Sequence, residues 1–292
     1  METMYGDKDR KEFDSMPDMM ERIEAAAREA GGIIRSAHGV DLQVENKEGR
    51  ANFVTRYDRM VQDFLTKRLR EILPEAKFLG EENGMDTFQP GDEDGWLFVI
   101  DPIDGTTNFI HNMHPFVTSI GLMKDGVPYA GVVYAPVTDQ MFSAVRGQGA
   151  YENGQRIHSS KAPLSESIML SGSAGFSMEA FAVAQELTRQ VQERCHGVRS
   201  TGSAEYNLCM TASGRAGGYY EMRLGLWDFC AGGLILEEAG GRITDYYGRP
   251  LSWRGPSGIV ALSEGIARED AKGMPDTGSF YDRWKRLGQQ QV

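Results

Sequence analysis

The stretch that most constrains the fold of this chain is residues 96–109, WLFVIDPIDGTTNF. Its first five residues are apolar or aromatic, and they predict a buried strand over 96–100. Two aspartates, Asp101 and Asp104, follow that run, so the end of the strand presents two carboxylates. Pro102 fixes a backbone torsion between them and stiffens the turn. The fold must therefore bury a strand and keep both acids at its exit.

The residues after the two aspartates are suited to hold an anion. Gly105, Thr106 and Thr107 offer backbone N–H groups, and a helix starting there would add the positive end of its dipole. The stretch contains neither Lys nor Arg, and neighbouring carboxylates repel each other unless a cation lies between them. Mg²⁺ would both relieve the repulsion and bind the anion, because it prefers carboxylate oxygens and shares its remaining sites with water and phosphate. A plain Asp-Gly turn with a helix cap is the alternative, and the complete string favours the metal site over it.

The composition is that of an ordinary globular protein and argues against some partners. The chain has 292 residues, 40% hydrophobic and 25% charged, which suffices for one large domain or two packed ones. Its net charge of −11 argues against nucleic acid or an anionic membrane as the main partner, since both require clustered positive charge. The three cysteines form no metal-binding or disulfide pattern. We see no signal peptide or membrane-spanning run, which predicts a cytoplasmic protein.

The beginning of the chain predicts a tail and two helices. Residues 1–18 lack periodicity and predict a loosely ordered tail. Apolar residues then recur at three- and four-residue steps between Pro17 and Gly39, and a second amphipathic helix is predicted from about Tyr57 to Leu73. Residues 44–58 are polar and predict a mobile loop or a weak hairpin between the helices.

Two different arrangements of strands follow. Short β-branched or aromatic runs predict an antiparallel sheet, which we assign with the two helices to an N-terminal sub-domain over 19–160. Strands then alternate with helices, which predicts a layered α/β sub-domain over 161–292. The predicted strands are 96–100, 117–123, 129–135, 168–173, 196–200, 216–222, 241–246 and 258–263, and the predicted helices of the second part are 177–195, 203–213 and 227–239.

Three further acids are candidates for the same site. Glu81 lies in GEEN, after a short predicted strand, where a solvated surface charge is the alternative. Asp228 lies in WDFCAGG, and it predicts either the N-cap of a helix or a metal ligand that the second sub-domain supplies. Asp58 lies in TRYD, where it is either a charge that favours the helix N-terminus or the partner of a hydroxyl, for which Thr106 is the candidate.

Taken in order, these motifs resemble the inositol monophosphatase family, from about residue 20 to residue 265. The strings that carry the resemblance are GEEN, WLFVIDPIDGTTNF, GVVYAP followed by GQGAYENGQRI, and YYEMRLGLWDFCAGGLILEEAGG. The resemblance implies a layered αβαβα sandwich shared with fructose bisphosphatases. It also implies a Mg²⁺-dependent, lithium-sensitive sugar-phosphate phosphatase with two or three Mg²⁺ ions per site, acting as a homodimer.

The resemblance assigns roles to individual residues. Glu81, Asp101 and the carbonyl of Ile103 look like ligands of one metal, and Asp101, Asp104 and Asp228 look like ligands of a second. Glu81 also looks like a ligand of a weaker third ion. Thr106 and Asp58 would polarise the attacking water, and Lys47 would approach a metal-bound water or the phosphate. The residues implied to contact substrate are Asp104, Gly105, Thr106, Gly202, Ser203, Ala204, Glu221 and Asp228.

The reaction expected from the resemblance is in-line attack of water on a small polyol phosphate, with inositol 1-phosphate as the first candidate. Fructose 1,6-bisphosphate, 3′-phosphoadenosine 5′-phosphate and NADP are the alternative substrates within the same superfamily. A regulatory binding protein that retains the fold is the alternative from another class. The full set of clustered acids argues against it, because such acids destabilise a fold unless metal offsets their repulsion.

Overall fold

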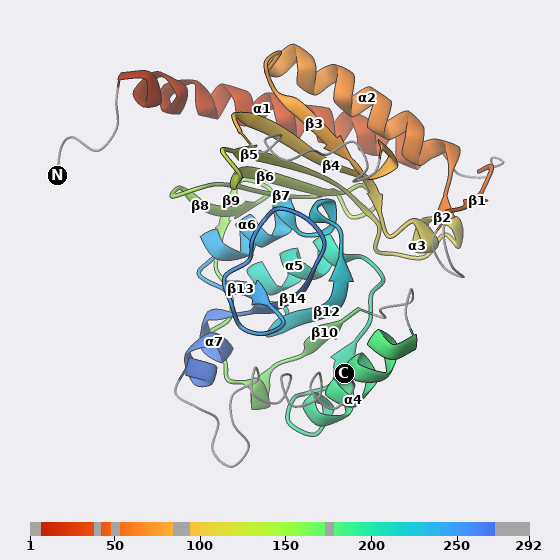
Figure 1. The fold of residues 1–292 in the computed structure, drawn as a ribbon, viewed down its shortest axis with the longest axis vertical. Coiled ribbons are helices and arrows are strands. Elements are labelled where there is room, and N and C mark those ends of the chain that lie inside the picture. Colours follow the sequence, from red (N-terminus) through yellow and green to blue (C-terminus); the bar gives the residue numbers. More distant parts are fainter. Residues whose placement is uncertain (1–6, 38–41, 48–52, 84–93, 173–177, 272–292) are drawn as a thin grey trace.

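Two helices cover one face of a seven-stranded sheet, and a second sheet lies beyond the other face (Figure 1). The computed structural model describes residues 7–37, 42–47, 53–83, 94–172 and 178–271. Helices α1 (Asp7–Arg35) and α2 (Arg56–Ile72) form the outer layer. Their apolar faces are buried against the sheet, with Ile23, Val61 and Leu65 at 0–1% exposure. The two periodic segments of the sequence therefore form this layer as predicted.

The first sheet follows the order of the chain. Its strands are β3 (Lys77–Gly80), β4 (Trp96–Asp104), β5 (Val117–Lys124), β6 (Val127–Ala135), β7 (Gln140–Val145), β8 (Gly149–Glu152) and β9 (Gln155–Ile157). Every neighbouring pair is antiparallel except β3 and β4, which are parallel. The predicted antiparallel sheet is therefore correct apart from its first pair. That pair places Gly80, the last residue of β3, beside Ile100 of β4, directly before Asp101.

The second sheet is mixed. Its strands are β10 (Met169–Ser171), β11 (Val198–Arg199), β12 (Gly218–Leu224), β13 (Arg242–Asp245) and β14 (Ser257–Leu262), in the spatial order β11-β10-β12-β14-β13. Helices α5 (Ala204–Ala212) and α6 (Cys230–Glu238) lie between the two sheets, and α4 (Met178–Gln192) and α7 (Glu264–Ala271) cover the outer face. The result is the expected layering of helix, sheet, helix, sheet and helix.

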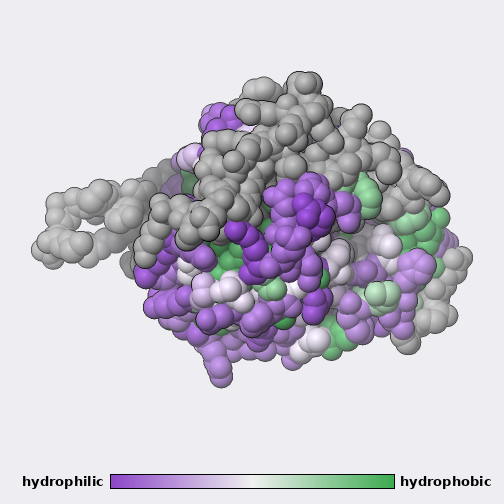
Figure 2. All heavy atoms as spheres, turned by 90° about the horizontal axis from the view of Figure 1, so that it is seen from below, coloured by the Kyte–Doolittle hydropathy of each residue, from purple (hydrophilic) through white to green (hydrophobic). Residues whose placement is uncertain are grey.

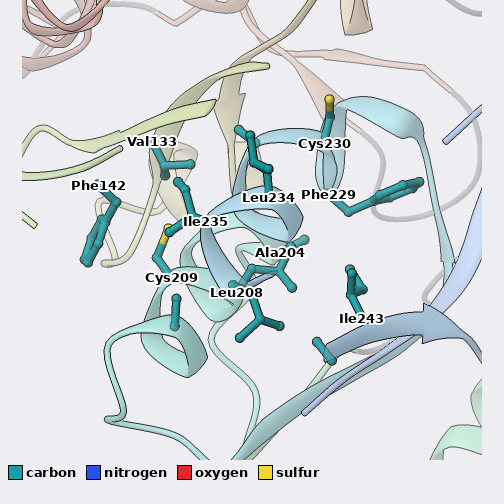
Figure 3. Close-up of a cluster of buried hydrophobic side chains, with 14 of the residues drawn as sticks. Val133, Phe142, Ala204, Leu208, Cys209, Phe229, Cys230, Leu234, Ile235 and Ile243 are labelled. Carbon is teal, nitrogen blue, oxygen red and sulfur yellow. The ribbon is translucent and has the colours of Figure 1, made fainter. Parts of the chain in front are cut away.

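The central layer is apolar and carries α5 and α6 between the sheets. Figure 3 shows Val133 and Phe142 of the first sheet facing Leu234 and Ile235 of α6, and all four side chains are buried. Because α5 and α6 contact both sheets, they join the two parts of the chain into one core. The change of sheet falls between Ile157 and Met169, and the division into two sub-domains at residue 160 stays a prediction.

The tail predicted for residues 1–18 is wrong from residue 7 onward, since α1 begins at Asp7 and continues through Pro17. Residues 1–6 lie outside the described ranges. A proline inside a helix costs about 3 kcal/mol or more. Here Met16 is 1% exposed, and its burial offsets part of that cost. The prediction failed because the segment before Met16 is too charged to show an apolar periodicity.

The shorter elements differ slightly from the predicted ones. The weak hairpin is present as β1 (Glu45–Asn46) paired with β2 (Phe53–Val54). The remaining described elements are three short 3₁₀ turns and one short helix. They are η1 (Glu81–Asn83), η3 (Leu164–Glu166), η4 (Leu226–Asp228) and α3 (Thr106–Ile110). None of the helices in the described ranges is long and apolar enough to cross a membrane. On the face drawn in Figure 2 the described residues are mainly hydrophilic, with apolar residues in small groups.

Candidate active site

Three carboxylates converge where β4 ends. Asp101 and Asp104 lie on β4, and Asp228 ends the turn η4 that precedes α6. One ligand atom from each of the three lies within 4.8 Å of the others, and Asp101 and Asp104 are buried. The pairing of β4 with β5 is irregular between Asp101 and Asp104. Such an irregularity re-aims side chains, and here both acids face the same site although they are three residues apart.

The electrostatics of the cluster favour a bound cation. Burial, together with the charges of Glu81, Asp104 and Asp228, raises the pKa of Asp101 well above its ordinary value. Burial and the charge of Glu81 likewise raise the pKa of Asp228. Carboxylates held this close in a buried site repel each other, and a divalent cation removes the repulsion. The donors are all carboxylate oxygens, which fit a hard cation such as Mg²⁺.

Asp104 is held by the N-terminus of α5. Its two oxygens accept hydrogen bonds from Ser203 Oγ at 2.6 Å, Ala204 N at 3.0 Å and Glu205 N at 2.7 Å. Burial raises the pKa of Asp104 to about 6, although these three donors act in the opposite direction. Ser203 and Ala204, expected to line the substrate pocket, are thus shown in contact with an acid of the cluster.

The chain folds tightly around the turn after Asp104. Gly105 adopts a left-handed conformation, with φ of 93°, and a Cβ built on it would lie 3.2 Å from the carbonyl oxygen of Gly202. Only glycine meets both requirements easily. Asn108 Nδ2 donates to the carbonyl oxygens of Pro115 and Thr201, both at 2.7 Å. The segment that carries Gly202 is therefore fixed beside the turn that carries Gly105.

Asp58 and Thr106 meet beside the acid cluster. Asp58 forms a capping box with Thr55, whose N and Oγ1 donate to Asp58 Oδ2 at 2.7 and 2.6 Å. The other oxygen, Oδ1, lies 3.2 Å from Thr106 Oγ1. Thr106 Oγ1 also lies 3.0 Å from the carbonyl oxygen of Ile103, whose N donates to Asp101 at 3.0 Å. Asp58 is therefore both a helix cap and the partner of the hydroxyl that the sequence suggested.

Glu81 reaches the cluster from the neighbouring strand. Gly80 is paired with Ile100 in the parallel register of β3 and β4, so Glu81 follows beside Asp101 and lies within hydrogen-bond reach of it. It is not one of the three acids within 4.8 Å of one another. Lys47 Nζ donates to Glu81 at 3.0 Å and to Glu82 at 2.6 Å. Burial lowers the pKa of Lys47, and these two ion pairs outweigh that effect and raise it overall.

Asp228 and Glu221 arrive from the second sheet. The helix predicted over 227–239 starts at Cys230 instead, and Asp228 accepts a hydrogen bond from Gly225 N at 2.6 Å. The N-cap alternative for Asp228 is wrong because residues 226–228 form a 3₁₀ turn that separates Asp228 from α6. Glu221 on β12 accepts a hydrogen bond from the buried Tyr219 hydroxyl. Its charge contributes to the raised pKa of Asp228, so Glu221 lies near the cluster.

Sequence reasoning missed three residues of the site, namely Thr55, Tyr219 and Glu205. Thr55 carries a recognisable signal, since Thr-x-x-Asp is the pattern of a capping box. Glu205 is fully buried, and burial with the nearby Asp104 raises its pKa to about 8. Its only signal is a lone acid in the otherwise uncharged segment 201–214. Tyr219 has no signal, because its role depends on a side-chain contact within one strand.

The raised pKa values predict that the metal-free protein loses stability as the pH rises. The pKa is raised to about 6 for Asp104, about 7 for Glu82 and about 8 for Glu205. The folded state therefore binds more protons than the unfolded chain, and this stabilisation is present below about pH 4 and lost through about pH 8. We expect the free energy of unfolding in EDTA to fall by on the order of 3 kcal/mol between about pH 5 and pH 8.5. Urea unfolding across that range measures it, and a rise in stability would contradict the burial of these charges.

The fold and the site define a layered α/β protein with a carboxylate cluster that could hold a metal ion, beside a Thr–Asp pair. The family model described as the inositol monophosphatase family matches residues 16–274. Inositol monophosphatase 1 of Rattus norvegicus is 35% identical over 264 residues, which cover 88% of this chain and 95% of the relative. The chain belongs to the inositol monophosphatase family, and it is a phosphatase, a phosphoric monoester hydrolase.

Solved structures agree with this assignment. The extragenic suppressor protein suhB of Bartonella henselae matches with a TM-score of 0.78 and 30% identity, over 94% of this chain and 99% of that one. SaIMPase-II, solved with inositol monophosphate bound, matches with a TM-score of 0.76 and 28% identity, over 94% and 99% of the two chains. The same protein has been solved with 2′-AMP bound, and that structure matches with a TM-score of 0.75 and 28% identity, over 94% and 97%.

Proposed function

We propose that this phosphatase hydrolyses inositol 1-phosphate, or a similar small polyol phosphate, with Mg²⁺ as its cofactor. The observation that carries the proposal is the cluster of Asp101, Asp104 and Asp228 next to the Thr106 hydroxyl, which Asp58 binds. The three carboxylates are suited to bind cations, and the Thr106–Asp58 pair is suited to hydrogen bond a water molecule. Together they provide the two components that hydrolysis of a phosphate ester requires.

The residues proposed to hold Mg²⁺ form two overlapping sets. One set is Glu81, Asp101 and the carbonyl oxygen of Ile103, and the other is Asp101, Asp104 and Asp228. Asp101 is common to both, and Glu81 is also proposed to hold a weaker third ion. When bound there, Mg²⁺ would neutralise the charge of the phosphate and of the leaving oxygen and make water more acidic.

The chain's own residues orient the reacting groups. The hydroxyl of Thr106 has one hydrogen, and donating it to Asp58 leaves an oxygen lone pair to accept a hydrogen bond from the attacking water. Thr55 holds the other oxygen of Asp58, which fixes the direction of the pair. The backbone N–H groups of Gly105 and Thr106 are proposed to bind the phosphate. Lys47 is proposed to move from its ion pairs with Glu81 and Glu82 toward a phosphate oxygen.

The proposal that the substrate is a polyol phosphate rests on the residues placed to bind its hydroxyl groups and on the relatives named above. Glu221, Asp104 and Asp228 are proposed to accept hydrogen bonds from substrate hydroxyls, and Gly202, Ser203 and Ala204 to line the same pocket. The relative from Rattus norvegicus is named inositol monophosphatase 1, and SaIMPase-II was solved with inositol monophosphate bound. The structure described as bound to 2′-AMP supports a nucleotide monophosphate as a second candidate substrate.

A substrate panel tests the proposal directly. Purified protein with Mg²⁺ should release phosphate fastest from inositol 1-phosphate, when compared with 2′-AMP, 3′-phosphoadenosine 5′-phosphate, NADP and fructose 1,6-bisphosphate. Activity should disappear in EDTA, return with Mg²⁺, and fall in lithium, as the family resemblance implies. Activity unchanged in EDTA would refute the metal mechanism, and a faster rate with another ester would refute the substrate. The homodimer and the cytoplasmic location expected from the sequence stay predictions.

A further inference from the structure

The side chain of Glu205 is fully buried and connects the two helices of the central layer. It is the second residue of α5, and its exposure is 0%. Its two oxygens accept hydrogen bonds from Ala231 N at 3.2 Å and Gly232 N at 2.5 Å, in the first turn of α6. None of the roles assigned above to metal, water or substrate involves this carboxylate.

Glu205 supplies the cap that α6 lacks. The first N–H groups of a helix have no partner within the helix, and a side chain normally satisfies one of them. The N-cap of α6 is Phe229, which makes no side-chain cap hydrogen bond. The Glu205 carboxylate from α5 accepts these hydrogen bonds in place of an N-cap side chain. A Cβ built on Gly232 would lie 2.3 Å from Glu205 Oε2, so the small residue at 232 is what permits this approach.

The same residue is bonded to an acid of the metal cluster. The backbone N of Glu205 donates to Asp104 Oδ2 at 2.7 Å. Its side chain holds Ala231 and Gly232, which lie three and four residues after Asp228. A single residue therefore connects the segment that holds Asp104 with the segment that carries Asp228.

A third element contacts the same carboxylate. The hydroxyl of Ser119 on β5 lies within hydrogen-bond reach of Glu205, and Ser119 is the register partner of Asp101 on β4. Ser119 Oγ also lies 3.4 Å from the carbonyl oxygen of Trp227, next to Asp228. The partners of Glu205 thus adjoin all three acids of the cluster, although Glu205 itself is not one of them.

We propose that Glu205 is a positioning residue that holds Asp104 and Asp228 at the spacing required to bind the divalent cation. The proposal rests on the proposed Mg²⁺ dependence. It assigns to Glu205 no contact with the cation or the substrate. Residues that orient metal ligands in this way typically change metal affinity by about 10–100-fold when they are substituted.

Glu205→Gln tests the proposal, because glutamine keeps the size of the side chain and replaces one acceptor oxygen with an NH₂ group. One of the two bonds to α6 is then lost. We expect the Kd for Mg²⁺, measured by calorimetry on the metal-free protein, to rise about 10–100-fold. The Mg²⁺ concentration needed for half-maximal activity should rise in parallel. At saturating Mg²⁺ the KM for substrate should stay within about twofold of the wild-type value, since Glu205 is assigned no contact with substrate.

Asp270→Asn is the matched control. Asp270 is also a buried carboxylate, with an exposure of 5%, and it accepts a hydrogen bond from Arg242 on the outer face of the second sheet. Its substitution should lower the Tm and leave Mg²⁺ affinity unchanged. Ser119→Ala provides a second variant, which removes a hydroxyl beside Glu205 and leaves the Glu205 side chain itself unchanged, and it should weaken Mg²⁺ binding by a smaller factor.

The outcomes separate this proposal from the proposed function. If wild-type protein binds no Mg²⁺, the metal site itself is refuted, and the role of Glu205 with it. If wild-type protein binds Mg²⁺ and Glu205→Gln binds it equally well, Glu205 only stabilises the fold and the proposal is wrong. Should Glu205→Gln fail to fold, Mg²⁺ affinity in Ser119→Ala decides, and an unchanged value overturns the proposal.

Discussion

Asp101→Asn is expected to lower kcat for inositol 1-phosphate by about 1,000-fold or more, because a metal centre supplies several kcal/mol of transition-state stabilisation. Asp101 is common to both proposed metal sets, and its side chain lies among Asp104, Asp228 and Glu81. Asparagine has nearly the same shape and retains one oxygen, so the fold should persist. Steady-state kinetics over a Mg²⁺ titration measures the loss.

The same variant should make the metal-free protein more stable. Removing one acid from a buried cluster relieves repulsion, and each kcal/mol relieved raises the Tm by about 2–4 °C. In EDTA at about pH 8 the Tm of Asp101→Asn should therefore exceed that of wild type, while the rise in Tm on adding Mg²⁺ should shrink. Asp63→Asn, at an exposed position of α2, is the control and should change neither quantity. Full activity in Asp101→Asn would refute its role as a ligand.

The positions of two acids of the cluster could be predicted from the residues next to them in the sequence. Asp101 and Asp104 follow an apolar strand within a few residues, so the position of the strand end places both of them. The position of Glu81 could not be predicted from its sequence neighbours alone, because its approach to Asp101 depends on β3 pairing with β4 in parallel. No local pattern specifies which strands pair. The predicted antiparallel sheet was wrong at the one pair that delivers Glu81.

Contacts between distant segments explain what the sequence did not reveal. Glu205 accepts a hydrogen bond from Ala231 N of α6, which lies 26 residues later in the chain. No residue near Glu205 in the sequence indicates this contact. Asp228 was placed at the start of a helix because Asp is a common N-cap, whereas tertiary contacts made the cap unnecessary. Local chemistry therefore identified the candidate ligands, and packing determined the residues that hold them in place.

Thr106→Ala should lower kcat by about 100–10,000-fold, the range typical for loss of a group that directs proton transfer. The hydroxyl of Thr106 lies 3.2 Å from Asp58 Oδ1, and alanine leaves nothing to orient the water. Thr106→Ser keeps the hydroxyl and should retain most of the activity. Thr107→Ala removes the hydroxyl of the next, exposed residue and should behave like wild type. In all three variants the KM should change little, because the backbone N–H groups remain.

Asp58→Asn should lower kcat by a comparable factor, since an asparagine NH₂ group directed at Thr106 would reverse the hydrogen bond between them. It should also cost about 1 kcal/mol of stability, because Asp58 accepts two hydrogen bonds from Thr55 that cap α2. If Thr106 and Asp58 act as one unit, the double variant loses no more activity than the worse single variant. Losses that multiply would show that the two residues act independently. A double-mutant cycle on kcat at saturating Mg²⁺ therefore distinguishes a coupled pair, which the 3.2 Å contact predicts, from two separate contributions.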